Sequence, residues 1–96
     1  MADTMMIETV GQPGKTYAVD AAKFLAMRTA VMAVLPRQAP GMAVADLIAA
    51  VRPGLPQDVF PGGATAGWWV KAVQLDLEAK GTVMRARGSP VRLWVA

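Results

Sequence analysis

The stretch that decides the fold is LDLEAKGTVMRARGSPVRLWV, residues 75–95. It begins with helical spacing and changes to two segments in which apolar and polar residues alternate. Gly81 is typical of a helix C-terminus, and Gly88-Ser89-Pro90 is typical of a turn between two strands. The sequence therefore predicts a helix followed by a β-hairpin, with strands over Thr82–Arg87 and Val91–Val95.

This hairpin carries the whole net charge of the chain. The chain has 10 Lys and Arg against 7 Asp and Glu, a formal charge of +3. All 7 acids lie in residues 1–80, where an equal number of bases cancels them, and residues 81–96 contain bases but no acid. If Met84 faces the core, the period of two places Trp94 and the arginines on the outer face of the hairpin. Those arginines are Arg85, Arg87 and Arg92.

The helix before the hairpin is expected to start near Thr65, as its N-cap, and to run to Lys80. Its apolar positions form two stripes, Trp69-Val73-Leu77 and Trp68-Ala72-Leu75-Ala79. A helix with two apolar stripes is wedged between other elements. Its narrow polar face is expected to hold Lys71, Gln74 and Glu78. At least one tryptophan of the pair is expected in the core, and the alternative is an exposed anchor for a partner.

Two further helices are predicted earlier in the chain. Asp20 is a good N-cap for a helix to about Leu35, which Pro36 ends. A shorter helix follows over about Val44–Val51, and the connection Arg52–Gly63, rich in Pro and Gly, joins it to the third helix.

Two segments leave alternatives open. In the first helix, Leu25 and Met32 begin a second apolar stripe, which either packs in the core or contacts another copy of the chain. Residues 1–19 are either a partly ordered arm or a short hairpin, with strands over Met6–Val10 and Thr16–Val19.

The order helix, helix, helix, β-hairpin resembles that of a winged helix-turn-helix domain. Leu75–Arg85 and Gly88–Leu93 resemble the passage from helix to wing in bacterial winged-helix regulators, where a Leu-Glu-x-x-Gly turn leads into a basic hairpin. The resemblance implies an α+β fold, with a winged-helix domain over 20–96 behind the arm or hairpin of 1–19. Separately, Val19–Phe24 and Phe60–Trp69 are similar to a small family of uncharacterised bacterial proteins.

In the winged-helix family, the third helix enters the major groove of DNA and the wing touches the backbone or the minor groove. The resemblance therefore implies that this chain is a regulator-like module that binds double-stranded DNA. Lys71 suits a phosphate, and Gln74 suits an adenine edge. The full set of implied contacts is Thr65, Lys71 and Gln74 on the helix and Arg85, Arg87 and Arg92 on the wing.

The alternative is a winged-helix module that binds a protein and no DNA. It rests on the long connection before the third helix and on the helix start Ala64–Trp68, which offers little to read a base. Candidate interaction residues are Leu25, Met32 and Trp94. A homodimer is compatible with both hypotheses, because paired modules reach two half-sites.

Enzyme chemistry is not expected. The chain has no Cys and no His, which excludes thiolate nucleophiles, Ser-His-Asp triads and metal sites built on these residues. Gly62 and Gly67 have the spacing of a phosphate-binding loop, but Trp68 and Trp69 stand where it needs Lys and Ser or Thr. No metal and no cofactor is expected.

A membrane partner is not expected either. The N-terminal residues lack the basic segment of a signal peptide, and the longest apolar run, Ala30–Leu35, is far shorter than the ~18 residues of a spanning helix. The sequence predicts a cytoplasmic protein.

Overall fold

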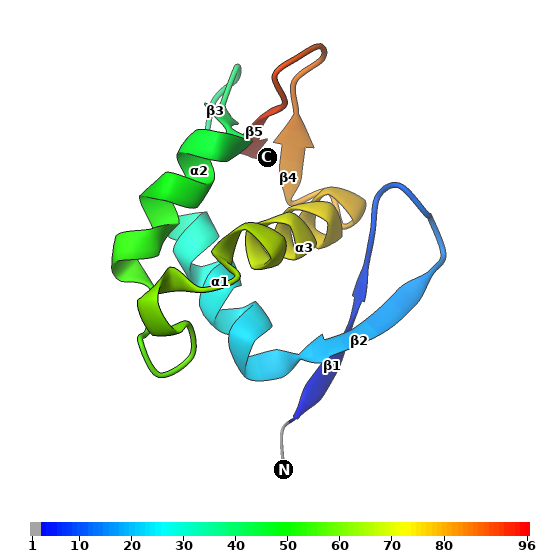
Figure 1. Cartoon of the computed structure of the whole chain (residues 1–96). Helices are drawn as coiled ribbons and strands as arrows, with labels where there is room; N and C mark the ends of the chain where they lie inside the picture. The colour runs from blue at the N-terminus through cyan, green and yellow to red at the C-terminus, as the bar shows by residue number, and fades with distance from the viewer. Residues whose placement is uncertain (1–2) are drawn as a thin grey trace.

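The computed structural model describes residues 3–96, and these form an α+β fold with three α-helices and two small antiparallel sheets (Figure 1). The predicted α+β class is confirmed, but two strands precede the first helix. Met1 and Ala2, the first residues of the predicted arm, lie outside the described residues. In chain order the elements are β1 (Thr4–Glu8), β2 (Thr16–Asp20), α1 (Ala21–Val34), β3 (Met42–Ala43), α2 (Val44–Val51), the short 3-10 turns η1 (Arg52–Gly54) and η2 (Pro61–Gly63), α3 (Ala66–Ala79), β4 (Val83–Arg85) and β5 (Arg92–Val95).

The ends of α1 follow from its flanking residues. The Asp20 carboxylate accepts a hydrogen bond from the Lys23 backbone N–H at 3.0 Å, which caps the first turn. At the other end Leu35 has an extended backbone, as expected of the residue before Pro36. In the part of the chain that the structure describes, neither this helix nor any other is long and apolar enough to cross a membrane.

The helix α3 lies at the centre of the domain and contacts α1, α2, β1 and β4. The predicted wedged position is therefore confirmed. Its C-terminus is closed by Gly81 at a φ of 77°, where the Thr82 N–H bonds the Leu77 carbonyl at 2.9 Å. The buried hydrophobic side chains of α3 are Ala66, Trp69, Val70, Ala72, Val73 and Leu77.

The β1–β2 hairpin packs on the helices through one face. Ile7 pairs with Tyr17 and Met5 with Val19, and these residues point to the same side of the hairpin. Ile7 and Val19 are buried in the core, so the N-terminal hairpin belongs to the domain. Met6, on the opposite face, is exposed.

The second sheet has the strand order β3–β5–β4. Strand β3, which the sequence did not predict, pairs Met42 with Leu93. Gly41, just before it, has a φ of 85°, and a Cβ atom there would collide with the Leu93 carbonyl. Glycine is therefore required where the chain passes this close to β5.

In the wing, here the β4–β5 hairpin over residues 82–95, the predicted facing of β4 is wrong, whereas that of β5 agrees with the structure, with Leu93 and Val95 in the core. Strand β4 pairs Met84 with Trp94 and Arg85 with Leu93. Because Arg85 pairs with the buried Leu93, it lies on the inner face of the hairpin. Met84 is exposed on the outer face. Val83, which is buried, makes the apolar contact that the sequence assigned to Met84.

Candidate nucleic-acid interface

The exposed side of α3 presents few polar side chains. Lys71 is exposed in the middle of the helix, and Thr65 is exposed at its start. Thr65 stands at the predicted N-cap position but does not cap, since its hydroxyl donates to the Ala64 carbonyl at 2.6 Å. Its backbone is left-handed, with a φ of 60°. Thr65 and Lys71 are therefore the sequence-predicted helix contacts that remain accessible.

The predicted contact from Gln74 to a base is contradicted by burial. Only 1% of this residue is exposed, because α3 is surrounded on several sides and the position of Gln74 faces its neighbours. Its amide nitrogen donates to Glu78 Oε2 at 3.0 Å, and its Oε1 has no hydrogen-bond partner among the described residues. Gln74 cannot reach a base edge from this position.

Arg85 is engaged inside the domain. Its guanidinium donates to both oxygens of Glu78, from Nε to Oε1 at 2.8 Å and from a terminal nitrogen to Oε2 at 2.9 Å. These hydrogen bonds raise the pKa of Arg85 above its ordinary value, against the opposing effect of burial. The side chain of Glu78 is only 6% exposed. Arg85 thus neutralises an acid on the candidate face. Its guanidinium is therefore less available for a phosphate than the sequence implied.

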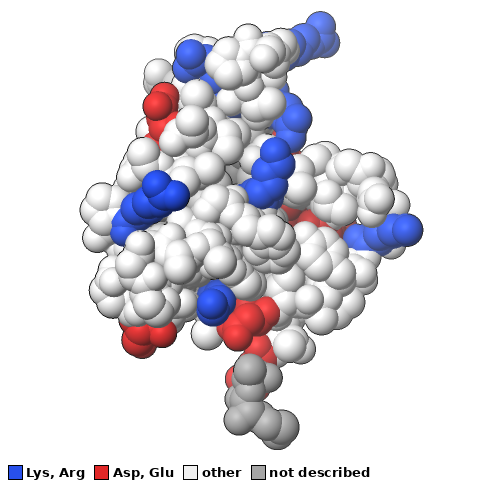
Figure 2. All heavy atoms as spheres, viewed as in Figure 1, with Lys and Arg blue, Asp and Glu red and all other residues white. Residues whose placement is uncertain are grey.

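The other two wing arginines differ in exposure. Arg87 lies in the exposed turn between the strands, and Arg92 is half-buried on β5, on the face it shares with Trp94 and Met84. The three arginines therefore do not share one outer face. Figure 2 shows basic side chains from the wing down to α3 on one side of the molecule.

The N-terminal hairpin lies beside α3, a contact between distant parts of the chain that the sequence did not indicate. The Glu8 backbone N–H donates to Asp76 Oδ1 at 2.8 Å, and the Val10 N–H donates to the Leu75 carbonyl at 3.2 Å. Asp76 is buried and also pairs with Lys80. Asp76 and Glu78 thus have separate partners, Lys80 and Arg85.

Trp68 is a candidate functional residue on this side that the sequence left ambiguous. It is 56% exposed, whereas Trp69 is in the core. The two rings meet edge to face with centroids 4.9 Å apart, which supports the exposed ring from below. A depression of about 130 Å³ lies beside it, lined by Tyr17, Trp68, Lys71, Ala72 and Leu75.

Of the residues expected to contact a protein, Leu25 and Met32 lie on α1, whereas Trp94 shares a face of the wing with Arg92. Leu25 is 48% exposed on α1, while Met32 and Trp94 are half-buried. Met32 packs against the core, so its stripe serves the fold at least in part. The homodimer stays a prediction.

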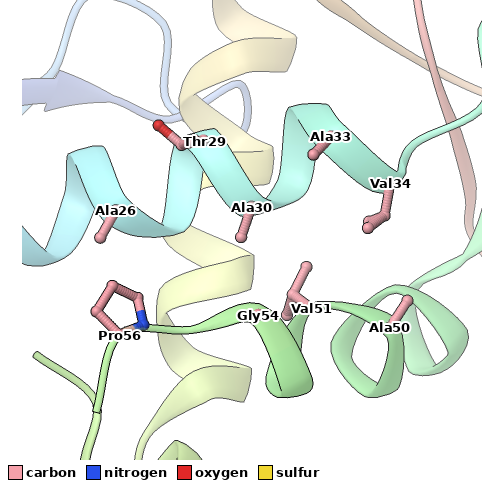
Figure 3. Close-up of a pocket in the computed structure, with 9 residues that line it drawn as sticks. All are labelled: Ala26, Thr29, Ala30, Ala33, Val34, Ala50, Val51, Gly54 and Pro56. Carbon is pink, nitrogen blue, oxygen red and sulfur yellow. The ribbon is translucent and has the colours of Figure 1, made fainter.

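An apolar hollow of about 360 Å³ lies between α1 and the segment from α2 to Pro56 (Figure 3). The side chains of Ala26, Ala30 and Val34 point into it from α1, and Val51 and Pro56 face them. The hydroxyl of Thr29 is the one polar side-chain group that lines it. Apart from this hydroxyl, the lining is apolar and holds no titratable side chain. Within residues 3–96, no group of three or more Asp and Glu side chains is placed to hold a metal ion.

Comparison with known families assigns the chain to one of them. Residues 4–93 match DUF6958, a family of unknown function, and the chain belongs to this family. No curated protein and no solved structure matches the chain.

Proposed function

We propose that the side of the domain formed by α3 and the wing binds double-stranded DNA, as a winged-helix module does. The observation that carries the proposal is electrostatic. Lys71 and Arg87 are exposed on this side with Arg92 nearby on the wing, and the acid of that region, Glu78, is buried and neutralised by Arg85. A surface that presents exposed cations, with the carboxylate of its central helix neutralised, attracts a phosphate backbone.

The arrangement of the elements supports the winged-helix interpretation. Helix α3 passes into β4 through a tight turn at Gly81, so the helix and the wing have a fixed relative position. The two hydrogen bonds between Arg85 and Glu78 reinforce this position. A rigid helix with an adjoining basic hairpin is suited to contact a groove and the neighbouring backbone together.

The burial of Gln74 affects the kind of binding that is expected. Base reading requires donors and acceptors at the groove edge, and the accessible polar side chains of α3 are Thr65 and Lys71. Phosphate contacts then supply most of the affinity, and sequence preference is modest. The affinity is strongly dependent on salt, since each neutralised phosphate lowers log K by about 0.9 per log unit of salt.

The test is a titration of the protein with a labelled duplex of mixed sequence, followed by fluorescence anisotropy at about 50 to 200 mM salt. Lys71→Ala and Arg87→Ala are each expected to lower the slope of log K against log salt by about 0.9. Arg28→Ala is the matched control, because it removes an exposed charge from α1. Absence of binding at the lowest salt, or equal slopes for all variants, contradicts the proposal.

A second candidate function, binding of a protein partner, is favoured by Trp68. A tryptophan that is more than half exposed and supported by a second ring is typical of the anchors that dominate protein interfaces. Trp68→Ala is then expected to abolish capture of a specific protein that the wild type and Arg87→Ala both retain. Loss of DNA affinity in Trp68→Ala, without any protein captured by the wild type, supports the first function instead.

A further inference from the structure

We propose that the N-terminal β1–β2 hairpin is a second arm of the DNA interface, which holds one backbone strand through Lys15 and Tyr17. The arm lies beside α3, so that α3 is flanked by this hairpin and by the wing. The inference rests on the proposed function and extends it to a segment outside the helix-and-wing pattern.

The hairpin is fixed in place on α3. Ile7 anchors it in the core with no exposed surface. The Glu8 N–H bonds Asp76 at 2.8 Å and the Val10 N–H bonds the Leu75 carbonyl at 3.2 Å, so β1 is attached along the C-terminal half of the helix. A hairpin held in this way presents its side chains at a constant position relative to α3, which lowers the entropic cost of binding.

The alternation of β2 directs its side chains toward the same groove. Val19 is buried and Tyr17 lines the depression beside Lys71, so this face of β2 is turned toward the helices. Lys15 is exposed two residues before Tyr17, just outside β2, at the turn end of the hairpin. Tyr17 and Lys71 therefore line one groove, and Lys15 follows beyond Tyr17 toward the turn of the hairpin.

Helical spacing places Lys71 between the two hairpins. Leu75, four residues later, lines the depression with Tyr17, and Glu78, seven residues later, binds Arg85 of the wing. Viewed along the helix axis, Leu75 and Glu78 lie on opposite sides of Lys71 but on the same face of the helix. Figure 1 shows the β1–β2 hairpin on one side of α3 and strand β4 of the wing on the other.

The chemistry of the groove fits a sugar-phosphate backbone. The Lys71 ammonium and the Tyr17 hydroxyl are donors for phosphate oxygens, and Ala72 and Leu75 give an apolar floor for deoxyribose. The Lys15 ammonium, two residues before Tyr17, is the second cation that the proposal assigns to the backbone. The depression of about 130 Å³ is below the ~300 Å³ at which pockets for small ligands begin. Nearby acids are compensated, since Asp76 pairs with Lys80 and Glu78 with Arg85. Glu8 lies on the strand face opposite to that of Tyr17.

The experiment compares Lys15→Ala, Tyr17→Phe and the control Arg28→Ala in the full chain, with the same labelled duplex and the same salt range. Lys15→Ala is expected to lower the salt slope by about 0.9, as the loss of one phosphate contact does. Tyr17→Phe keeps the ring against α3 and removes only the hydroxyl, so a loss of affinity of about 3-fold with an unchanged slope is expected. Hydroxyl-radical footprints of the wild type are expected to show backbone protection on two sides of the groove, one of which Lys15→Ala removes.

The outcomes separate the two proposals. If the wild type binds and Lys71→Ala weakens it, but Lys15→Ala and Tyr17→Phe behave like Arg28→Ala, the second arm is refuted and the proposed function stands. If the wild type does not bind duplex DNA at the lowest salt, both fail. Circular dichroism of each variant shows whether a loss of affinity comes from loss of folding. If Lys15→Ala is unfolded, the affinity of Tyr17→Phe, which preserves the packed ring, decides between the two outcomes for the second arm.

Discussion

Glu78 on α3 and Arg85 on β4 lie seven residues apart and are joined by two hydrogen bonds of 2.8 and 2.9 Å. The pair spans the turn at Gly81, so it connects the last turn of the helix to the first strand of the wing. The Glu78 side chain is nearly buried and the Arg85 side chain is 40% exposed, which places the pair at the margin of the core.

We expect this pair to contribute a measurable coupling free energy. A double-mutant cycle with Glu78→Ala, Arg85→Ala and the double variant, measured by urea unfolding, is expected to give about 1 kcal/mol, since a bidentate charged pair is stronger than an exposed one but is still reached by solvent. Arg87→Ala, in the exposed turn of the wing, is the control and is expected to leave the free energy of unfolding within about 0.5 kcal/mol of the wild type. A coupling of zero indicates that the pair does not fix the wing.

Gln74→Leu is expected to keep or increase stability. Gln74 is buried and its Oε1 has no partner among the described residues, so the substitution removes an unsatisfied acceptor together with one hydrogen bond to Glu78. Thermal unfolding is expected to show a change in the free energy of unfolding between about 0 and +1 kcal/mol. Duplex affinity is expected to stay unchanged, and a large loss of affinity in a folded Gln74→Leu variant contradicts the buried position.

Gly41→Ala is expected to destabilise the domain by about 2 kcal/mol or more, because it adds a collision with the Leu93 carbonyl to an unfavourable φ. Gly14→Ala is a closely matched control. Gly14 has the same φ of 85°, but nothing lies within 4 Å of the added Cβ, so only the backbone strain of about 1 kcal/mol is expected. The difference between the two variants in urea unfolding measures the close approach of β3 and β5. Equal losses of unfolding free energy in the two variants contradict this close approach.

The predicted homodimer is tested at Leu25. If the exposed stripe of α1 pairs two copies, light scattering of the wild type gives a dimer, and Leu25→Glu converts it to a monomer because a buried charge is costly. Met6→Glu is the control, since Met6 is an equally exposed apolar residue on the β1–β2 hairpin. A wild type that is monomeric over a wide range of concentration contradicts the predicted homodimer.

Strong local signals made much of the fold predictable. Asp20 and Pro36 bound α1, and Gly81 ends α3, because capping and chain geometry act within a few residues. Two residues of β3 are too short to carry a periodic pattern, so its pairing with β5 had no sequence signal.

The candidate site was predicted less well, and for physical reasons. An alternating strand has two facings, and the choice of Met84 over Val83 for the core inverted the predicted facing of β4 but not that of β5. Gln74 was assigned to the polar face by residue type, whereas the number of neighbours around α3 decides its burial. The hydrogen bonds between the N-terminal hairpin and α3 join residues 65 or more positions apart, and no local pattern reports them.

The order of strands in the second sheet has a consequence for how the domain is assembled. Strand β5 is the middle strand of the β3–β5–β4 sheet and comes after the other two along the chain. During synthesis from the N-terminus, β3 and β4 therefore emerge from the ribosome without their shared neighbour. The ladder hydrogen bonds of β3 and β4 in this sheet require residues 92–95 between them, so the sheet can be completed only after β5 has been synthesised.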